Sequence, residues 1–393
     1  MCGYVGFTGT MPEASLHLRV MMDSIVHRGP DSDGQHVDDD VALGFRRLSI
    51  IGLEDGSQPI YNEDRSLVIV FNGEIYNYRS IKDELQSLGH VFATHADTEV
   101  LIHGYEEWGV DLLDRLRGMF SFAIWDTTSQ ELFLARDYYG IKPLYYAVIG
   151  DSLVFASEIK SILEFPGFEK VLNEKALESY LTFQYSSLPE TFFTGVFRLP
   201  PAHYAIVRGT DIEITRYWEP VFAPEKKSLE QSVDEIDRTF RDSVEAHKIA
   251  DVEVGSFLSS GVDSSYVAAT FNGDKTFTVG FDYGTDYNEI TYAKELSELI
   301  GIDHYSKLIT SDEYWDILPT IQYHMDEPNA DPSAVALYFV SELASKHVKV
   351  VLSGEGADEL FGGYNIYRQP MDLKPWMRIP APIRRWLSRW AET

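Results

Sequence analysis

The sequence has one cysteine, no long apolar run and little positive charge near its start. Because Cys2 is the only cysteine, no intrachain disulfide can form. No run of about 18 apolar residues occurs, so no segment is expected to span a bilayer. The first basic residue is Arg19, and no positively charged region precedes an apolar stretch, so a secretory signal is not expected. We therefore expect a cytoplasmic protein.

Positive charge is also scarce over the whole chain. The 33 basic and 62 acidic residues give a formal net charge of -29 at pH 7. Such a surface repels phosphate backbones and anionic lipid head groups. We expect neither nucleic acid nor membrane as a partner. A metal-bound nucleotide remains compatible with the sequence, because the local charge of a site can oppose the net charge.

The 393 residues predict two to three domains with ordinary globular composition, since 44% are apolar and 24% charged. Residues 1–218 contain short apolar stretches between glycine, aspartate and asparagine turns, which favour strands. Helical periods interrupt these strands. The expected strands include 67–71, 120–125, 131–135 and 153–156, and the expected helices are 78–88, 98–108 and 173–183. This half is predicted to be α+β, with stacked layers.

The chain changes character after residue 218. Residues 219–228 contain Pro220 and Pro224 among charged residues and are predicted to form a linker. In residues 229–393, apolar residues first recur at helical spacing, and strands then alternate with helices. The strands are expected at 252–258, 276–281 and 348–352, and the helices at 229–247, from 262 and at 289–300. Repeated strand–helix units predict an α/β domain with a parallel sheet.

The position of Cys2 is the first indication of chemistry. If Met1 is removed, Cys2 carries both a thiol and a free α-amine, and the amine can take the thiol proton directly or through one water. One residue would then supply nucleophile and base. A cysteine at the second position is more often incidental, so Cys2 alone does not decide the function.

Other residues of this half offer groups that suit a free amino acid. Asn72 and Gly73 can provide an amide and a backbone N–H for a developing oxyanion. Arg47 can bind a carboxylate, and Glu74 and Asp97 can hold an ammonium group. Each residue also has an ordinary structural explanation. Asn-Gly is a common hairpin turn after a strand, and an arginine often pairs with a surface acid.

Several blocks of this half resemble those of class II glutamine amidotransferases and occur in the family order. The blocks are MCGYVG at 1–6, HRGPD at 27–31, RLSI at 47–50, FNGEIYN at 71–77 and DTE at 97–99. The resemblance implies an N-terminal-nucleophile sandwich of two antiparallel sheets between helices. It also implies that Cys2 attacks the glutamine amide and that Asn72 and Gly73 form the oxyanion hole. The implied glutamine-binding residues are Arg47, Leu48, Ile50, Ile51, Asn72, Gly73, Glu74 and Asp97.

A second group of small residues, FLSSGVDSS at 257–265, follows a predicted strand and opens a predicted helix. Backbone N–H groups at a helix start can bind pyrophosphate, and Asp263 can reach a Mg²⁺ ion. A tight turn between strand and helix explains the same residues about equally well. The segment resembles the pyrophosphate loop of N-type ATP pyrophosphatases, except that Ser260 stands where that pattern has glycine. A later block, VVLSGEGADELFGGY at 350–364, also follows a strand.

The order of the two halves resembles the family of glutamine-dependent asparagine synthetases, which are ligases. The resemblance implies ATP and Mg²⁺ as cofactors and glutamine and aspartate as substrates, with a homodimer left open. It assigns Glu355 to catalysis and Asp263 and Asp358 to the metal. The implied ATP-binding residues are Leu258, Ser259, Gly261, Asp263, Ser264, Val279, Ser353 and Gly354. Family chains continue well beyond position 393, so we expect an incomplete ATP-pyrophosphatase domain, with glutaminase activity retained and synthesis weak or lost.

Three alternatives stay open at this stage. One is a related ATP-dependent amidotransferase that acts on another carboxylate, and another is a non-catalytic paralogue. The third open point is the role of residues 326–332, which either shape the acceptor pocket or form a solvated loop.

Overall fold

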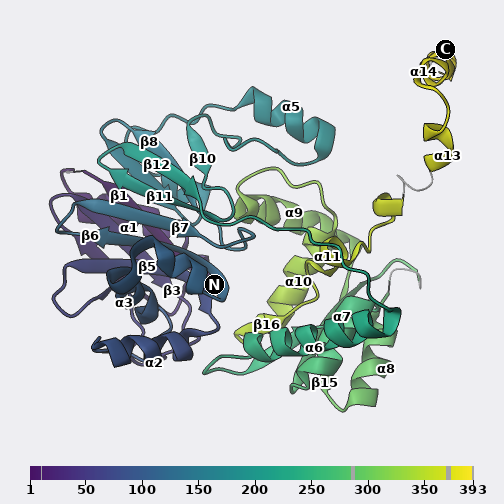
Figure 1. Ribbon diagram of the computed structural model, residues 1–393, viewed down its shortest axis with the longest axis horizontal. Helices are drawn as coiled ribbons and strands as arrows, with labels where there is room; N and C mark the ends of the chain where they lie inside the picture. Colours follow the sequence, from purple (N-terminus) through teal and green to yellow (C-terminus); the bar gives the residue numbers. More distant parts are fainter. Residues whose placement is uncertain (10, 285–287, 369–372, 392–393) are drawn as a thin grey trace.

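The chain folds into two parts that each have their own sheets. The computed structural model describes residues 1–9, 11–284, 288–368 and 373–391. Two six-stranded sheets occupy the first part, and a four-stranded sheet lies in the second (Figure 1). The chain between Tyr217 and Ser228 contains neither helix nor strand and connects the two parts.

Every strand pair in the first part is antiparallel. The first sheet has the order β10-β8-β9-β1-β3-β2, with β1 (Gly3–Thr8), β2 (Ser32–Val37), β3 (Val41–Arg47), β8 (Tyr145–Ile149), β9 (Ser152–Ala156) and β10 (Val196–Arg198). The second has the order β12-β11-β7-β6-β5-β4, with β4 (Ile60–Tyr61), β5 (Leu67–Ile75), β6 (Gly118–Asp126), β7 (Glu131–Arg136), β11 (His203–Arg208) and β12 (Asp211–Arg216).

Side-chain alternation along the strands builds three apolar layers in this part. On β5, Ile69 and Phe71 pack toward α2 (Tyr78–Leu88) and α3 (Glu99–Trp108), whereas Val68 and Val70 pack between the sheets. The outer face of the first sheet packs against α1 (Ala14–Asp23) and α4 (Ile159–Ile162). The remaining helices are η1 (Val26–Arg28), η2 (Gly109–Arg115) and α5 (Glu174–Phe183). The predicted sandwich of two antiparallel sheets between helices is confirmed.

The second part contains a parallel sheet with the order β15-β14-β13-β16, as predicted. Its strands are β13 (Val254–Phe257), β14 (Lys275–Phe281), β15 (Asp303–Ile309) and β16 (Val350–Leu352). Its helices are α6 (Leu229–His247), α7 (Val262–Phe271), α8 (Ile290–Ile300), α9 (Ser311–Met325), α10 (Ser333–Ser345), α11 (Ala357–Phe361), η4 (Asn365–Arg368), α13 (Lys374–Met377) and α14 (Ala381–Ala391). In Figure 1, α13 and α14 lie away from this sheet.

The first two residues of the segment 326–332, Asp326 and Glu327, contact the first part of the chain. Of the remaining residues, Pro332 lines a cavity of the second part, and Pro328, Ala330 and Asp331 are exposed. Asp326 is buried: it accepts a hydrogen bond from the Ile159 N–H at 2.7 Å and pairs with Lys160 at 2.9 Å. Glu327 accepts from the Phe192 N–H at 3.1 Å and pairs with Arg198. These acids are neither solvated nor free to shape an acceptor pocket, because basic groups of the first part already neutralise them.

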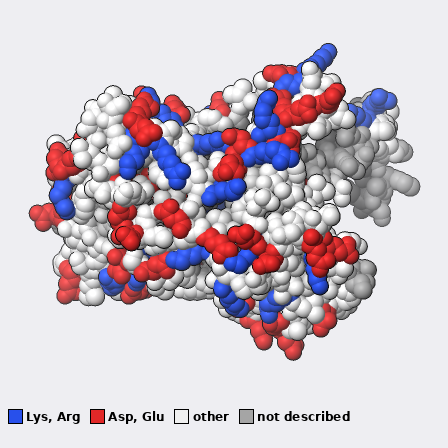
Figure 2. All heavy atoms as spheres, turned by 90° about the horizontal axis from the view of Figure 1, so that it is seen from below, with Lys and Arg blue, Asp and Glu red and all other residues white. Residues whose placement is uncertain are grey.

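Acidic and basic side chains are interspersed on the face drawn in Figure 2, so the excess negative charge does not gather in one patch there. Among the described residues, no helix combines the length and the apolarity needed to cross a bilayer.

Candidate functional site

Cys2 lies at the edge of the layer between the two sheets. It precedes β1 and has the same parity as Tyr4, whose side chain packs in that layer. The Leu48 N–H donates a hydrogen bond to the Cys2 sulfur at 3.4 Å, and the thiol lies 3.5 Å from the Leu48 carbonyl oxygen. Burial raises the pKa of the Cys2 thiol. The thiol is therefore positioned but needs a base to become a nucleophile.

Two side chains hold the backbone carbonyl of Cys2. Arg28 donates from Nε to this oxygen at 2.9 Å. In the amide orientation that satisfies both neighbours, Asn72 donates to the same oxygen at 3.0 Å and accepts from Arg28 Nη2 at 3.3 Å. Asn72, a predicted site residue, therefore does meet Cys2. Arg28 lies within the HRGPD block, but the sequence did not single it out as a site residue.

Asn72, Gly73 and Glu74 lie within β5, so the predicted end of the strand at residue 71 is wrong, and the alternative of a hairpin turn at Asn72-Gly73 does not hold. Their backbones pair with β6, with Gly73 opposite Phe120. A Cβ atom on Gly73 would lie 2.2 Å from the Met119 carbonyl oxygen, so only glycine fits this close approach. The strand was predicted too short because its apolar alternation stops at Phe71, whereas its backbone pairing continues.

Two carboxylates lie near Cys2 in an environment that disfavours their charge. By strand alternation, Glu74 points to the same face of β5 as Asn72. Its Oε2 atom is buried and has no hydrogen-bond partner among the described residues. Burial, followed by the charge of Asp97, raises the pKa of Glu74 well above its usual value. Burial also raises the pKa of Asp97 to about 6, although its Oδ2 accepts from the Ile75 N–H at 2.9 Å. A ligand cation here would favour both charged forms.

Arg47 binds its own loop in this structure. Its Nη2 donates to the carbonyl oxygens of Ile51 at 3.2 Å and Gly52 at 2.6 Å, and its Nη1 donates to Leu53 at 3.3 Å. The guanidinium of Arg47, which was predicted to bind a carboxylate, thus donates to the backbone of residues 51–53 in this structure. Arg47 shapes the loop that also carries Leu48, Ile50 and Ile51, and its charge offsets part of the rise that burial causes in the pKa of Asp97.

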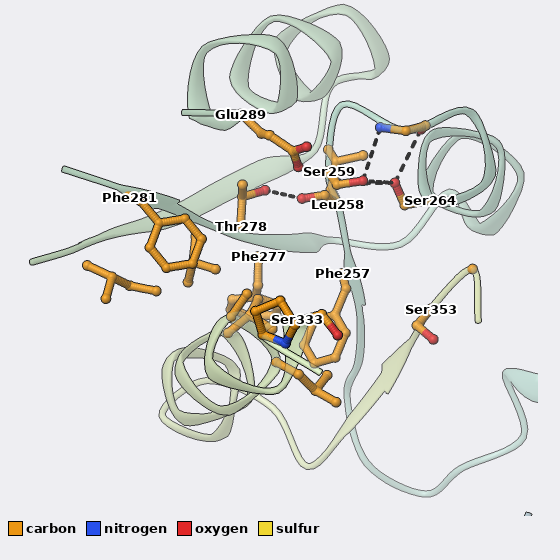
Figure 3. A pocket seen from close by; sticks show the side chains of 18 of the residues that line it. Phe257, Leu258, Ser259, Ser264, Phe277, Thr278, Phe281, Glu289, Ser333 and Ser353 are labelled. Atoms are coloured by element: carbon orange, nitrogen blue, oxygen red, sulfur yellow. Dashed lines mark hydrogen bonds between the residues drawn. The ribbon is translucent and has the colours of Figure 1, made fainter. Parts of the chain in front are cut away.

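The second site is a cavity of about 950 Å³ at the carboxyl ends of β13, β14 and β16. All residues predicted for nucleotide, metal and synthetase catalysis line it, namely Leu258, Ser259, Gly261, Asp263, Ser264, Val279, Ser353, Gly354, Glu355 and Asp358. Figure 3 shows the serine loop on one side and the aromatic side chains of Phe257, Phe277 and Phe281 on the other. The cavity therefore combines a polar end with an apolar wall.

Hydrogen bonds fix the serine loop before α7. The Ser259 N–H donates to Ser264 Oγ at 3.1 Å, and the two hydroxyl oxygens lie 2.8 Å apart (Figure 3). The Gly261 N–H donates to Ser259 Oγ at 3.0 Å. Ser260 does not have a positive φ angle, so serine adopts this backbone without the strain that would require glycine.

The loop after β16 packs directly on the start of α7. A Cβ atom on Gly354 would lie 2.9 Å from the Ser264 nitrogen and 3.0 Å from Asp263 Cβ. Asp263, in the first turn of α7, and Asp358, in the first turn of α11, both line the cavity. Carboxylate oxygens are the ligands that Mg²⁺ prefers, so these two residues fit such an ion.

Comparisons with known proteins agree with this division of sites. The family "Glutamine amidotransferase domain" matches residues 1–218, and "Asparagine synthase" matches residues 235–392. The chain is 33% identical to the putative asparagine synthetase [glutamine-hydrolyzing] 2 of Methanocaldococcus jannaschii, over 98% of this chain and 79% of that protein. The chain belongs to the glutamine-hydrolysing asparagine synthetase family.

Asparagine synthetase [glutamine-hydrolyzing] 1 of Bacillus subtilis is 45% identical over 98% of this chain and 62% of that protein. The chain thus spans about three fifths of the length of that relative. A solved glutamine phosphoribosylpyrophosphate amidotransferase from B. subtilis has 18% identity and a TM-score of 0.42, covering 78% of this chain and 65% of that one.

One basic residue of this family member was not found by sequence reasoning. Lys142 is buried near Cys2 and Glu74, and burial lowers its pKa to about 8. Its Nζ lies 2.7 Å from the Met1 sulfur, and burial lowers the pKa of the Met1 amine to about 5. Lys142 lies in the loop between β7 and β8, outside every block that carries the family resemblance, so the sequence held no signal for it.

Proposed function

We propose that this protein is a glutamine-hydrolysing asparagine synthetase. ATP activates the side-chain carboxylate of aspartate as β-aspartyl-AMP with release of pyrophosphate. Ammonia released from glutamine then displaces AMP and gives asparagine, with glutamate as the other product. We assign residues 1–218 to the glutaminase and 229–393 to the synthetase, joined by the linker 219–228. This use of ATP fits a cytoplasmic location.

In the glutaminase site, the thiolate of Cys2 attacks the glutamine amide carbon after removal of Met1. The freed α-amine of Cys2 accepts the thiol proton, and Asn72 with Gly73 stabilises the oxyanion. Glu74 and Asp97 bind the glutamine ammonium, whose positive charge favours the charged forms of these two buried carboxylates. Arg47 binds the carboxylate or holds the loop of Leu48, Ile50 and Ile51 around the substrate.

In the synthetase site, the serine loop holds pyrophosphate with Ser259, Gly261 and Ser264. Leu258, Val279, Ser353 and Gly354 frame the nucleotide. Mg²⁺, held by Asp263 and Asp358, would neutralise phosphate charge during the displacement. Glu355 supports formation of the acyl-adenylate and acts as base toward ammonia. Water would destroy this reactive anhydride, so ammonia should arrive through the contact between the two parts.

One observation supports the proposal most: every residue predicted for ATP, metal and synthetase catalysis lines one cavity, although these residues come from segments about 90 positions apart in sequence. A scaffold protein has no need for this convergence. The apolar aromatic wall also suits a nucleotide base.

ATP–pyrophosphate exchange with a panel of carboxylate acceptors tests the synthetase assignment. We expect exchange that requires aspartate. Exchange driven by another acceptor but not by aspartate would favour the alternative of an amidotransferase for a different carboxylate.

Glutamate release from glutamine, measured together with intact mass, tests the other site. We expect release only from chains that lack Met1, and its loss in Cys2→Ser. Folded, Met1-free protein that releases no glutamate would favour the non-catalytic paralogue.

A further inference from the structure

A cluster of two histidines and two glutamates lies on the helical side of the first part. Glu63 follows β4, His90 follows α2, and His103 and Glu106 lie three positions apart on α3. One ligand atom of each lies within 4.8 Å of the others. None of the four belongs to either site described above. Three separate segments thus bring metal-ligating atoms to one point.

The spacing of these atoms suits a small cation. His103 Nδ1 lies 3.3 Å from Glu63 Oε2 and 3.9 Å from Glu106 Oε2. His90 Nδ1 lies 3.9 Å from Glu63 Oε1 and 3.8 Å from Glu106 Oε2. Four ligands at about 2.0–2.2 Å from a tetrahedral zinc ion lie roughly 3.3–3.6 Å from one another. Small side-chain adjustments would therefore complete the coordination.

His103 provides an independent sign of a ligand. Its side chain is 1% exposed, and its Nδ1 has no hydrogen-bond partner among the described residues, although a carboxylate lies close by. Its other nitrogen, Nε2, faces the buried carboxylate of Glu99 at 3.4 Å. A proton on Nε2 directed at Glu99 leaves the Nδ1 lone pair pointing into the cluster. Metal-bound histidines are typically oriented by such a carboxylate.

The backbone holds Glu99 in this orienting position. Its two carboxylate oxygens accept hydrogen bonds from the N–H groups of Ala93 and Thr94, each at 2.6 Å. Because both oxygens are fixed, the imidazole of His103 is fixed as well. The cluster therefore has a rigid, buried ligand on one side and the partly exposed Glu63 and Glu106 on the other.

We propose that Glu63, His90, His103 and Glu106 bind one divalent transition-metal ion, with Zn²⁺ as the best fit. Two imidazoles and two carboxylates are donors that Zn²⁺ accepts in tetrahedral sites. The ion ties the turn after β4 and the end of α2 to α3. Since α3 begins two residues after Asp97, the ion also braces the segment that carries this carboxylate.

Metal titration of the full chain tests this site. The protein carries Cys2→Ser to remove the thiol, contains no affinity tag and is first dialysed against a chelator. Titration with Co²⁺ is followed by visible absorption, and Zn²⁺ is then added in competition. We expect one ion per chain, the strong visible bands of tetrahedral Co²⁺, their loss on addition of Zn²⁺, and a higher unfolding temperature with Zn²⁺. Absence of stoichiometric binding would overturn the proposal.

Variants locate the bound ion. His90→Gln and Glu106→Gln each remove one ligand and should weaken Co²⁺ binding at least tenfold. Glu99→Gln removes the orienting carboxylate and should weaken it about 10–100-fold. The controls are Glu84→Gln, an exposed glutamate that pairs with Arg115, and His95→Gln, an exposed histidine that pairs with Asp55. Unchanged binding in His90→Gln and Glu106→Gln, or equal losses in the controls, would show that the ion binds elsewhere.

Discussion

The carboxylate of Asp251 accepts a hydrogen bond from the backbone N–H of Gly52 at 2.8 Å. The Asp251 N–H in turn donates to the Ile50 carbonyl oxygen at 3.0 Å. Asp251 lies between α6 and β13 in the second part, whereas Gly52 lies in the loop that Arg47 shapes beside Cys2. The second part therefore holds the loop that carries the proposed glutamine-binding residues.

Asp251→Ala should raise the KM for glutamine by roughly tenfold with little change in kcat. The variant removes a hydrogen bond to a charged acceptor, which is worth about 1.5–3 kcal/mol, and so loosens the substrate loop without touching the thiol. Glutaminase kinetics measure both constants. Asp251→Asn retains an acceptor oxygen and should recover most of the loss.

Asp242→Asn is the matched control for Asp251→Ala. Asp242 also joins the two parts, through an exposed ion pair with Arg117 at 2.6 Å, but it does not contact the loop. We expect a near-normal KM in this variant. An equal rise in both variants would mean that general loosening of the contact between the parts, and not the loop itself, sets the affinity.

A buried chain of charges connects Cys2 to the second part. Arg28, which binds the Cys2 carbonyl, pairs with Glu158 at 2.8 Å, and Lys160 pairs with both Glu158 and Asp326. Burial opposes the charged form of Glu158, but His27, Arg28 and Lys160 outweigh it and lower its pKa to about 2.

Glu158→Gln should destabilise the protein at neutral pH by about 3–5 kcal/mol, because it leaves buried cations without their partner. The pKa of Glu158 is lower in the folded state than the usual value near 4.5. Its stabilisation is thus complete above about pH 4.5 and is lost as the pH falls toward 2, a contribution of up to about 3 kcal/mol. Urea unfolding at several pH values should show a smaller acid dependence in the variant.

Glu84→Gln provides the comparison for Glu158→Gln. Glu84 pairs with Arg115 at the surface, where both side chains are more than 40% exposed. We expect a change within about 0.5 kcal/mol. A comparable loss in both variants would contradict the importance of burial in the Glu158 network.

Glu74→Gln should stabilise the protein while it impairs glutamine binding. Burial and Asp97 raise the pKa of Glu74, so the folded state holds its proton more tightly than the unfolded state. Folding stability from this group is present at low pH and is lost as the pH rises through the raised pKa. Replacement by a neutral side chain should raise the unfolding free energy at pH 8, and raise it less at pH 4. Urea unfolding at both pH values, together with the KM for glutamine, measures the two effects. Equal or lower stability at pH 8 would contradict the assigned cause of the pKa shift.

The sequence predicted elements best where periodicity and an end signal agree. The helix predicted at 78–88 has these bounds in the structure, and it ends at Gly89 with φ 111°. The helix predicted at 229–247 also matches, because the Ser228 hydroxyl and the Gln231 side chain form a capping box at its start. Strand β5 was predicted too short, since polar residues continue its pairing after the apolar alternation stops.

The candidate site could be predicted where its residues lie in compact sequence blocks. Asn72 meets Cys2, and the residues of both loops in the second part converge on one cavity. Lys142 and Asp251 lie outside these blocks and reach the first site only through tertiary packing. Local sequence patterns do not indicate contacts between residues that are far apart in the chain. The same reason explains why Asp326 was not expected to pair with Lys160.

Gly354→Ala and Ser260→Gly, two small substitutions in the loops around the cavity, should affect ATP–pyrophosphate exchange differently. Gly354→Ala places a methyl group 2.9 Å from the Ser264 backbone nitrogen, so the loops must separate, and ATP–pyrophosphate exchange should fall at least tenfold. Ser260→Gly instead restores the glycine of the family pattern. Because Ser260 lacks a positive φ angle, no strain is relieved, and exchange should stay within about twofold of the unsubstituted protein. Glutamate release should be unchanged in both variants, since neither residue contacts the Cys2 site. Normal exchange in Gly354→Ala would mean that the loops do not need this close contact to bind the nucleotide.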